Sequence, residues 1–447
     1  MTNKYLVNVF EKVKQKNPYE LEFQQAVYEV LNSIEPYVNE HKEIEELNII
    51  ERLVEPERII TFRVPWLNDE GKVCVNRGYR VQFNSAIGPY KGGLRFHPSV
   101  NQSIIKFLGF EQTLKNSLTG LFMGGAKGGS DFDPKGKSDK EIMSFCQSFM
   151  TELYRHIGPD TDIPAGDIGV GKKEIGYLFG QYKRITNTFV GTITGKPLEF
   201  GGSLGRTEAT GYGLAYYTSK MLEEMSNTNY RDKKVIISGS GNVALYTLEK
   251  VTNLGGKVIA MSDSNGYILD ENGIDFKVLQ EIKEVKKERI SKYVETIKTA
   301  KYFENAKQMW TIKCDIALAC ATQNEIDLDC AKILVANNVI LVGEGANMPC
   351  TIEATNYFIE NKVLFAPAKA ANCGGVMVSG FELSQNSSRT IWSKQEVDDK
   401  LKQQMENILH EVLACAKHYG NPYDTVLGAN ITGFKKVANA MISQGVI

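Results

Sequence analysis

Five short apolar runs in the second half of the chain restrict the folds open to it. They lie at residues 235–237, 258–261, 316–320, 339–342 and 363–365, with helical segments between them. Continuous apolar runs are typical of strands that are buried on both faces, and alternation with helices is typical of parallel sheets. The pattern therefore predicts a doubly wound, Rossmann-type α/β domain.

A glycine-rich turn follows the first of these runs. The chain passes from the expected strand into a helix through Gly239, Ser240, Gly241, Asn242, Val243 and Ala244. Gly239 permits a tight turn and Gly241 lets the backbone approach a pyrophosphate, while the helix N-terminus supplies N–H donors. The segment predicts a dinucleotide site, and a sharp turn without a ligand is the alternative.

The end of the second apolar run is the expected ribose-binding position. Asp263 lies about 20 residues beyond the glycine turn, where an acid favours NAD by accepting hydrogen bonds from a free 2′-hydroxyl. Ser262 and Ser264 argue for NADP, because hydroxyl groups can donate to a 2′-phosphate. Lys286 and Arg289 could add positive charge, although a solvated helix face is the alternative for them. The residues alone leave the cofactor open.

The first half of the chain has a different pattern. Residues 1–55 have helical periodicity, and residues 59–83 predict two strands joined by a turn. Ser138 and the glutamate three positions later have the spacing of a capping box, ahead of a helix expected to reach about His156. A flexible glycine-rich stretch near residue 200 predicts a domain boundary.

Two lysines lie in glycine-rich segments of this half. Lys91 lies within residues 88–95, which follow the alternating strand and are expected to form a loop at a sheet edge. Lys127 lies within residues 124–131, where small neighbours allow the backbone to fold closely around it. For Lys91 taken alone, an ordinary surface position is the alternative.

A third lysine lies on a helix expected from about residue 101 to 117. Lys115, Gln112 and Leu108 share one face of that helix, and Leu108 is expected to be buried. Desolvation and nearby lysines lower the pKa of a lysine, as a base near neutrality requires, which makes Lys127 the candidate base. Because three lysines in one pocket would repel one another, the arrangement predicts a doubly negative substrate.

Two further segments carry polar candidates. Asp167 lies in a glycine turn at residues 164–171, where an ordinary turn residue is the alternative. Residues 369–382 contain Asn372 and Ser379, and their spacing alone does not assign them to the pocket.

Composition excludes several classes of protein. The 52 basic and 53 acidic residues leave a net charge of -1, which offers no general attraction to nucleic acid or to an anionic membrane. The eight cysteines lack metal-site spacing, so we expect reduced core residues and no metal. Without a signal peptide or a run of about 18 apolar residues, no membrane span is expected, and a cytoplasmic location is the default.

Motifs along nearly the whole chain resemble the hexameric glutamate dehydrogenase family. In chain order they are GPYKGGLRFHPSV, KFLGFEQ, GGAKGGSDFDP, PAGDIGVG, EATGYG, GSGNVA, CATQNEI, GANMP and VSGFELSQNS. The resemblance implies reversible oxidative deamination of L-glutamate to 2-oxoglutarate and ammonium, as part of amino acid metabolism and nitrogen assimilation. Ser240 and the sequence SDSNG at residues 262–266 are similar to the NADP-preferring members, so NADP is expected and NAD is the alternative.

The resemblance also implies an architecture. Residues 1–200, completed by 425–447, would form an α/β substrate and oligomerisation domain with a mixed sheet. Residues 201–424 would form the Rossmann-type dinucleotide domain, with the active site in the cleft between the two. A homohexamer is implied in the same way.

The resemblance assigns substrate contacts to particular residues. Lys91 and Ser379 would bind the side-chain carboxylate of the substrate. Gln112 and Lys115 would bind the α-carboxylate, and Gly166 would contribute a backbone contact.

It also assigns catalytic and cofactor roles. Lys127 would activate water and stabilise the carbinolamine, and Asp167 would carry the proton of the amino group. The implied cofactor contacts are Thr210, Gly239, Ser240, Gly241, Asn242, Val243, Asp263, Ser264, Asn347 and Asn372.

Two alternative functions compete with this interpretation. A related dehydrogenase for leucine, valine or phenylalanine is disfavoured, because an apolar substrate would leave Lys91 desolvated and unpaired. A catalytically silent nucleotide-binding protein is disfavoured by the presence of Lys127 and Asp167. The chain departs from the family at Phe122 and Thr207, where prolines are typical, and we expect an effect on loop stiffness rather than on chemistry.

Overall fold

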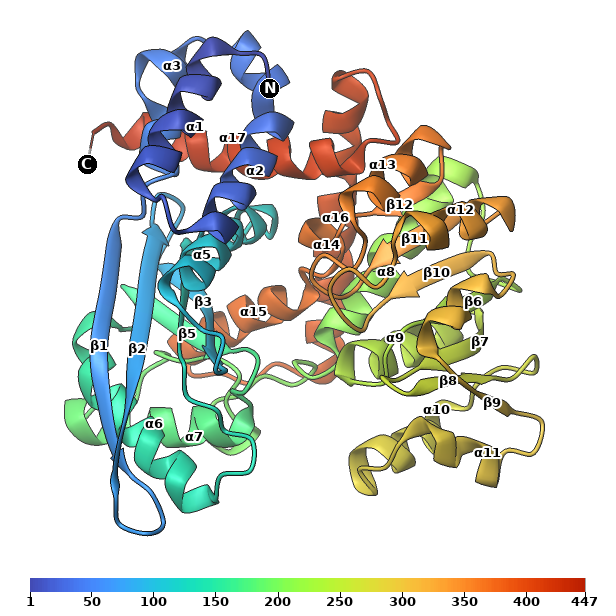
Figure 1. Cartoon of the computed structure of the whole chain (residues 1–447), viewed down its shortest axis with the longest axis horizontal. Coiled ribbons are helices and arrows are strands. Elements are labelled where there is room, and N and C mark those ends of the chain that lie inside the picture. The colour runs from blue at the N-terminus through green and yellow to red at the C-terminus, as the bar shows by residue number, and fades with distance from the viewer. Residues whose placement is uncertain (447) are drawn as a thin grey trace. The chain divides into compact units, whose positions relative to one another are not determined.

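The computed structural model describes residues 1–446, which form two compact units (Figure 1). Unit 1 contains residues 1–204, 379–394 and 430–446, and unit 2 contains residues 205–378 and 395–429. Residues 379–394 thus belong to unit 1, although the sequence interpretation assigned them to the dinucleotide domain. Among the described residues, no helix has the length and apolar character needed to cross a membrane.

Unit 1 combines a sheet with helices on both faces. Its elements are α1 (Lys4–Lys16), α2 (Leu21–Glu40), α3 (Glu43–Glu46), α4 (Ile49–Leu53), β1 (Arg58–Leu67), β2 (Val73–Asn84), β3 (Tyr90–Phe96), α5 (Gln102–Leu118), β4 (Gly125–Ser130), α6 (Asp139–Leu153), η1 (Tyr154–His156), β5 (Asp162–Gly166), α7 (Lys172–Thr186), η2 (Leu198–Phe200), and the later parts of α15 (Gly374–Ser388) and α17 (Thr425–Gln444).

The sheet of unit 1 has the strand order β1-β2-β4-β3-β5. β2 is antiparallel to both β1 and β4, whereas β3 is parallel to both β4 and β5. The predicted hairpin is confirmed, since Leu67 pairs with Val73 across a turn in which Gly71 has a φ of 77°. The expectation of a mixed sheet is confirmed as well.

The glycine-rich segment around Lys91, which the sequence predicts as a loop, is a strand, and so is the glycine-rich segment around Lys127. Lys91 lies in β3 and Lys127 in β4, and both strands are in the interior of the sheet. A Cβ atom on Gly92 would lie only 1.6 Å from the carbonyl oxygen of Ala126 on the neighbouring strand. Glycine is needed here because two strands approach closely, and glycine in a strand has that meaning as often as it marks a turn.

Each face of this sheet is covered by helices. On one face, Leu94 and Phe96 of β3 share an apolar core with residues of α6 and α7. On the other face lies α5, so close that a Cβ atom on Gly125 would be 1.9 Å from the hydroxyl oxygen of Thr113. The predicted capping box at Ser138 is confirmed, and α6 ends at Leu153, followed by a short 3-10 turn to His156.

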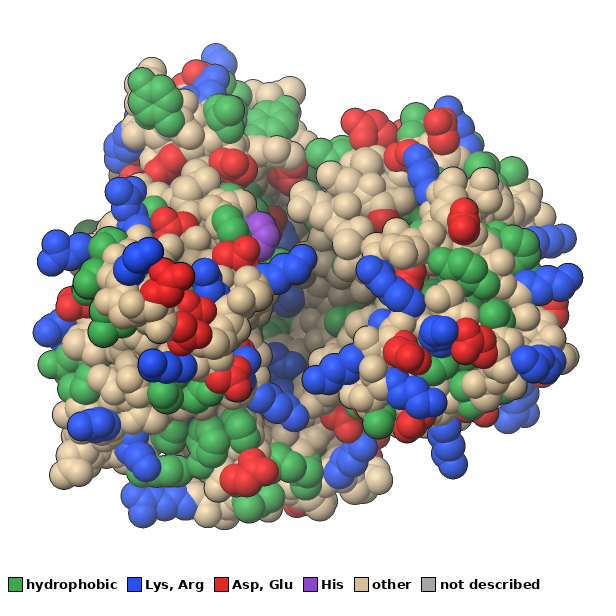
Figure 2. All heavy atoms as spheres, turned by 60° about the horizontal axis from the view of Figure 1, so that its bottom comes forward, with side chains coloured by type: hydrophobic (Ala, Val, Ile, Leu, Met, Phe, Trp, Pro, Cys, Tyr) green, Lys and Arg blue, Asp and Glu red, His purple; other side chains and the backbone are tan. Residues whose placement is uncertain are grey.

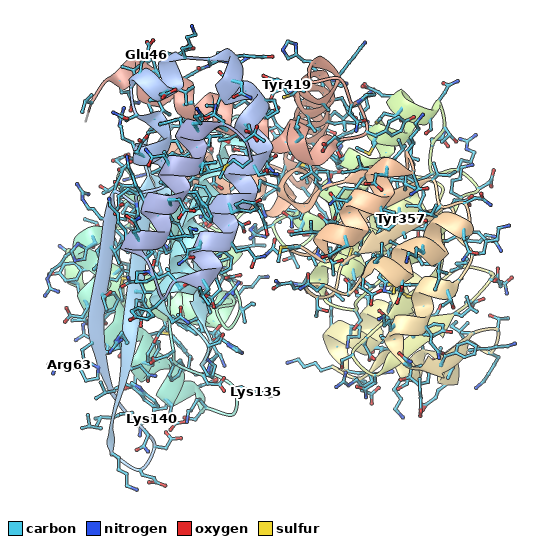
Figure 3. The ribbon with its side chains drawn as sticks, turned by 45° about the horizontal axis from the view of Figure 1, so that its top comes forward. Glu46, Arg63, Lys135, Lys140, Tyr357 and Tyr419 are labelled. Atoms are coloured by element: carbon cyan, nitrogen blue, oxygen red, sulfur yellow. The ribbon has the colours of Figure 1, made fainter. Side chains whose placement is uncertain are left out.

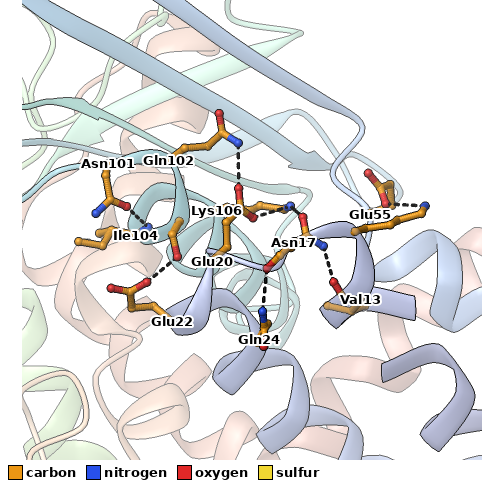
Figure 4. Close-up of polar contacts among 12 residues, drawn as sticks. Val13, Asn17, Glu20, Glu22, Gln24, Glu55, Asn101, Gln102, Ile104 and Lys106 are labelled. Atoms are coloured by element: carbon orange, nitrogen blue, oxygen red, sulfur yellow. Dashed lines mark hydrogen bonds and ion pairs between the residues drawn. The ribbon is translucent and has the colours of Figure 1, made fainter. Parts of the chain in front are cut away.

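The N-terminal helices are attached to α5 by polar contacts around the buried Lys106 (Figure 4). Lys106 of α5 donates from Nζ to Glu20 Oε2 at 2.8 Å and also to Asn17, and Gln102 donates to Glu20 Oε1 at 2.9 Å. The ammonium group of Lys106 also lies 4.3 Å from the ring centre of Phe23. A buried charge is tolerated at this junction because an acid and an aromatic face contact it.

Unit 2 alternates strands and helices. Its elements are α8 (Ala209–Ser226), β6 (Lys234–Ile237), α9 (Asn242–Asn253), β7 (Lys257–Ser262), β8 (Gly266–Leu269), α10 (Phe276–Gln280), η3 (Glu281–Val285), η4 (Ile290–Lys292), α11 (Tyr293–Thr296), β9 (Lys301–Glu304), η5 (Ala306–Thr311), β10 (Ile316–Ala319), α12 (Leu328–Ala336), β11 (Leu341–Glu344), α13 (Ile352–Glu360), β12 (Leu364–Ala366), α14 (Ala368–Ala371) and α16 (Lys394–His418).

The sheet of unit 2 has the order β12-β11-β10-β6-β7-β8-β9. The five predicted apolar strands are β6, β7, β10, β11 and β12, and they are mutually parallel, so the doubly wound arrangement is confirmed. β8 and β9 add an antiparallel edge that the sequence did not predict. The strand order reverses at β6, which places a topological switch point beside the glycine turn.

Charges and cysteines are distributed as expected from composition. Figure 2 shows Lys and Arg side chains interspersed with Asp and Glu on the face that it draws, in keeping with the net charge of -1. All eight cysteines are free, and six of them are buried.

Candidate active site

Two lysines of unit 1 are buried in the sheet. Lys91 and Lys127 are only 1% and 7% exposed. Lys135 and Lys140 show the ordinary behaviour of a lysine, with side chains that extend from the surface (Figure 3). Burying an ammonium group is costly unless charge or hydrogen bonds compensate, so Lys91 and Lys127 are the stronger functional candidates.

A carboxylate and an arginine connect the strands around Lys127. Asp167 Oδ2 lies 3.0 Å from Lys127 Nζ and 3.0 Å from Arg95 Nε. Residues 91, 93 and 95 alternate along β3 and therefore share one face, the face on which Arg95 meets Asp167. Gly93 leaves room for this contact, because a Cβ atom there would be 2.9 Å from the Cβ of Asp167. Lys91, Lys127 and Asp167 thus lie on one face of the sheet.

The charge state of Asp167 follows from these contacts. Burial alone would raise the pKa of Asp167, but the positive charges of Lys127 and Arg95 hold that pKa below its ordinary value. The sequence indicated Lys127 beside other lysines and named Asp167 as a candidate, but it did not predict the direct contact between Lys127 and Asp167.

Helix α5 carries the next candidates. Leu108, Gln112 and Lys115 are all half-buried on one face, so Leu108, which was expected to be buried, is only partly so. Gln112 donates from Nε2 to Asn116 Oδ1 at 2.7 Å, and Asn116 donates to the backbone oxygen of Lys91 at 3.0 Å. Asn116 therefore couples the helix face that carries Gln112 to the strand that carries Lys91.

Ser379 lies on α15 and is attached to unit 1 by a buried ion pair one turn further along. Glu382 accepts hydrogen bonds from Gly195 N at 2.9 Å and from Lys196 Nζ at 2.7 Å. Burial lowers the pKa of Lys196 although Glu382 opposes that shift. This pairing explains why residues 379–394 belong to unit 1, and it fixes the helix on which Ser379 lies.

Two groups near the site were missed in the sequence. Arg95 lies four residues after Lys91, and reading this segment as a strand would have placed both on one face. Thr194 is fully buried, its N–H donates to Pro164 O at 3.0 Å, and its hydroxyl has no hydrogen-bond partner within residues 1–446. A buried hydroxyl without a partner is a candidate for a ligand contact. Gly166 is half-buried at the end of the same strand, β5.

The opposite face of the sheet carries a second buried ion pair. Arg80 and Asp162 are both fully buried; Arg80 Nε donates to Asp162 Oδ2 at 2.8 Å and Nη1 donates to Gly92 O at 3.0 Å. Gln82 donates to the same carboxylate at 3.0 Å. These contacts extend from β2 past β4 to β3 and β5. Strand β3 carries Lys91, and β5 directly precedes Asp167.

Replacing Arg80 by methionine should destabilise unit 1. Asp162 would remain as a buried charge without its main partner, and such losses cost about 3 to 5 kcal/mol of unfolding free energy. Urea denaturation followed by circular dichroism measures the change. The double variant Arg80→Met with Asp162→Asn should recover part of the loss because no unpaired charge remains. A single variant as stable as the wild type would contradict the role of this pair.

In unit 2, the glycine turn has the geometry expected for a dinucleotide. Gly239 has a φ of 86°, which favours glycine, and Gly241 is the N-cap of α9. Asn242 is the first residue of that helix and is exposed, while Ser240 and Val243 are half-buried. The unpaired N–H groups at this helix end can bind an anion.

The ribose-side residues differ in their availability. Asp263 is bonded within its own turn, where Oδ1 accepts from Asn265 N at 2.9 Å and Oδ2 lies 3.8 Å from Arg289 Nη1. Ser262 is buried, and its oxygen accepts a hydrogen bond from Gly239 N at 3.0 Å. Ser264 is exposed and accepts from Arg289 Nη1 at 2.7 Å. Of the expected phosphate donors, Ser264 and Arg289 are therefore adjacent and accessible.

Three further cofactor candidates lie in unit 2. Asn372 donates from Nδ2 to Asn347 Oδ1 at 2.9 Å, so two residues distant in sequence are in direct contact. Thr210 is the second residue of α8 and is half-buried. The part of the chain that the structure describes contains no group of three or more His, Cys, Asp or Glu residues arranged to hold a metal.

Two family models match the chain. One, described as Glutamate/Leucine/Phenylalanine/Valine dehydrogenase, matches residues 201–445, which is more than half of the chain. The chain belongs to this dehydrogenase family. A second model, described as the Glu/Leu/Phe/Val dehydrogenase dimerisation domain, matches residues 56–184. The predicted family and the predicted class of oxidoreductase are confirmed.

Relatives of this dehydrogenase are similar over their full length. The NADP-specific glutamate dehydrogenase of Helicobacter pylori is 55% identical, over 99% of this chain and 100% of the relative. The NAD-specific glutamate dehydrogenase of Porphyromonas gingivalis is 53% identical, over 98% of this chain and 99% of the relative. The crystal structure of Plasmodium falciparum glutamate dehydrogenase has a TM-score of 0.97 at 55% identity, covering 99% of this chain and 95% of that chain. The two-domain α/β fold is confirmed.

Proposed function

We propose that this dehydrogenase catalyses the reversible oxidative deamination of L-glutamate to 2-oxoglutarate and ammonium, with NADP as its cofactor. The observation that carries the proposal is a buried lysine, Lys91, on the sheet face that also carries Lys127 and Asp167. A cation there suits a substrate with a second carboxylate and disfavours the leucine, valine and phenylalanine alternatives. The full-length relatives named above, which are glutamate dehydrogenases, support the same activity.

Substrate binding in this proposal orients the α-carbon. Lys91 and Ser379 bind the side-chain carboxylate, and Gln112 and Lys115 bind the α-carboxylate, as charge-assisted hydrogen bonds favour. Gly166 adds a backbone contact. With both carboxylates fixed, the α-hydrogen has one defined direction, which lowers the entropic part of the barrier.

Proton transfer in this proposal depends on the Lys127–Asp167 pair. A bound nicotinamide, which Asn347 and Asn372 would hold, would supply the acceptor for the hydride that leaves the α-carbon. Lys127 takes a proton from the water that attacks the iminium and stabilises the carbinolamine. Asp167 passes this proton from Lys127 to the amino group, which leaves as ammonia while the carbinolamine hydroxyl returns a proton to Lys127. That the substrate and cofactor groups meet in a cleft between the domains, which excludes water on closure, stays a prediction.

The preference for NADP is supported by the ribose-side residues. A negatively charged 2′-phosphate needs donors and positive charge, and Ser264 and Arg289 supply both within 2.7 Å of each other. Asp263, the candidate acceptor for a free 2′-hydroxyl, is already bonded to backbone groups of its own turn. Thr210, Ser240, Asn242, Val243, Asn347 and Asn372 are proposed as the remaining contacts, with Gly239 and Gly241 shaping the turn.

Replacing Arg289 by alanine should reduce the preference for NADPH over NADH. Loss of one charge-assisted hydrogen bond to phosphate costs about 1.5 to 3 kcal/mol, or about 10- to 150-fold in kcat/KM for NADPH, with little change for NADH. Absorbance at 340 nm with 2-oxoglutarate and ammonium measures both cofactors and tests the overall activity. Lys277→Ala, which removes an exposed charge of the same unit that is not a cofactor candidate, is the matched control.

Each outcome of this assay has a defined meaning. Faster oxidation of NADPH than of NADH, with the preference lost in the Arg289 variant, supports both parts of the proposal. A wild type that prefers NADH would contradict only the cofactor assignment. Folded protein that binds a nucleotide but turns over neither would favour the silent nucleotide-binding alternative.

A homohexamer is proposed on family resemblance and has structural support in unit 1. β1 is an edge strand, and its unpaired backbone edge can join a strand of another chain. In the β1–β2 hairpin, Leu67, Val73 and Val75 are 53%, 69% and 60% exposed, which is unusual for large apolar side chains. The matching of residues 56–184 to a dimerisation domain agrees with association through this region. A cytoplasmic location stays a prediction.

A further inference from the structure

Glu344 is a buried acid of unit 2 with no place in the mechanism above. It is the last residue of β11 and is 6% exposed. Its two carboxylate oxygens bond to different loops: Oε1 accepts from Cys350 N at 3.2 Å, and Oε2 accepts from Ala368 N at 2.8 Å. One side chain thereby connects the loop after β11 to the loop after β12.

The backbone cannot make this connection by itself. The ladder between β11 and β12 ends at the pair Gly343 and Ala366, and the next residue, Pro367, has no N–H to donate. Ala368 begins the short helix α14, so its N–H has no partner within that helix. Glu344 supplies the acceptor at the point where strand pairing stops.

Both connected loops carry proposed cofactor contacts. Asn347 lies in the loop between Glu344 and Cys350, and Asn372 directly follows α14. Asn372 donates to Asn347 Oδ1 at 2.9 Å and to Ala346 O at 3.2 Å, so the two loops also meet at their tips. We propose that Glu344 is a positioning residue that holds Asn347 and Asn372 in the arrangement that binds the nicotinamide half of the cofactor. The proposal rests on the proposed function, which assigns these two asparagines to the nicotinamide.

The chemistry of the side chain fits this role. An ionised carboxylate accepts two N–H groups at once, whereas a glutamine offers one acceptor oxygen and presents an NH₂ group to the second donor. Burial raises the pKa of Glu344 to about 7, while the backbone donors and the Cys350 thiol oppose that rise. At pH 8 the carboxylate is therefore mostly ionised and accepts from both loops.

Glu344→Gln tests the proposal through nucleotide binding at pH 8. We expect the Kd for NADPH, measured by its fluorescence, to rise about tenfold, as for loss of one hydrogen bond to a charged group. The Kd for 2′-phospho-ADP-ribose, which lacks the nicotinamide, should change less than twofold. A purely structural role would weaken the binding of both ligands equally, and that result would overturn the proposal. An unchanged Kd for NADPH would overturn it as well.

A matched control is available in the same unit. Asp270 is 2% exposed and bonds to Asn272 N and to the hydroxyl of Thr299, beyond the end of β8 that lies away from the glycine turn. Asp270→Asn should leave both Kd values at the wild-type level. If Asp270→Asn weakens the binding of NADPH as much as Glu344→Gln does, the effect is not specific to Glu344 and the proposal is wrong.

Failure of the inference can be distinguished from failure of the proposed function. Two results together overturn only the inference: the wild type oxidises NADPH with 2-oxoglutarate, and the Glu344→Gln variant binds NADPH with the wild-type Kd. Wild type that binds NADPH but lacks activity contradicts the proposed function, and a selective loss of NADPH affinity in the variant would still support the inference. Wild type that binds neither NADPH nor NADH overturns both.

Discussion

Replacing Lys127 by alanine is expected to reduce kcat by about 10²- to 10⁴-fold, the usual contribution of a positioned acid–base group. In the wild type, Lys127 Nζ lies 3.0 Å from Asp167 Oδ2, so the variant removes one member of the proposed proton-transfer pair. Asp167 keeps its contact with Arg95 at 3.0 Å, and for that reason the fold should survive. Turnover of 2-oxoglutarate and ammonium at 340 nm measures the loss.

Two further variants separate chemistry from charge. Lys127→Arg keeps a positive charge beside Asp167, but a guanidinium does not release its proton near neutral pH, so activity should remain low. Asp167→Asn should also reduce kcat, while thermal unfolding of all three variants should stay close to wild type or fall modestly. An arginine variant with near wild-type kcat would show that Lys127 acts only through its charge.

The second large effect is expected on substrate selection. Lys91→Met should lower kcat/KM for 2-oxoglutarate by a factor of about 30 to 5,000, because a buried carboxylate would lose its cationic partner. This factor corresponds to about 2 to 5 kcal/mol of lost transition-state stabilisation. Turnover of 2-oxopentanoate, which has a methyl group in place of that carboxylate, should fall much less or rise. The ratio of the two kcat/KM values is the measurement.

Lys106→Met is the matched control for this experiment. Lys106 is also a buried lysine of unit 1, at 4% exposed, but it pairs with Glu20 near the N-terminal helices. Its replacement removes a buried charge without touching the proposed site, so stability should fall while the substrate ratio stays constant. Equal ratios in the Lys91 and Lys106 variants would contradict the assignment of Lys91.

The nucleotide-binding half of the fold was predictable because its signals are local. Each buried strand appears as an uninterrupted apolar run, and the turn at Gly239 requires a positive φ that glycine tolerates best. The β1–β2 hairpin was predictable for the same reason, since alternation and turn residues are adjacent in the chain. Strand β8 escaped notice because its first residue, Gly266, was read as the end of the turn at residues 262–266. Strand β9, with the sequence KYFE, escaped notice because charged residues flank its two aromatic residues.

The substrate half of the fold was misread where glycine has two meanings. A glycine-rich segment is compatible with a loop or with strands in close approach, and only the neighbouring strand distinguishes them. The 1.6 Å clash that a Cβ on Gly92 would make with Ala126 depends on a residue 34 positions away. Local periodicity carries no information on such a pairing.

By itself, the sequence determined the family, the doubly wound domain, the hairpin and the identities of the candidate residues, because these depend on short-range patterns and on motifs. Only the tertiary structure decided which groups meet: Asp167 with Lys127, Arg289 with Ser264, and Glu344 with the two loops beside it. Arg80 and Asp162 lie 82 residues apart and still form one buried pair. Such contacts depend on strand order and register, which result from the packing of the whole sheet and not from any one segment.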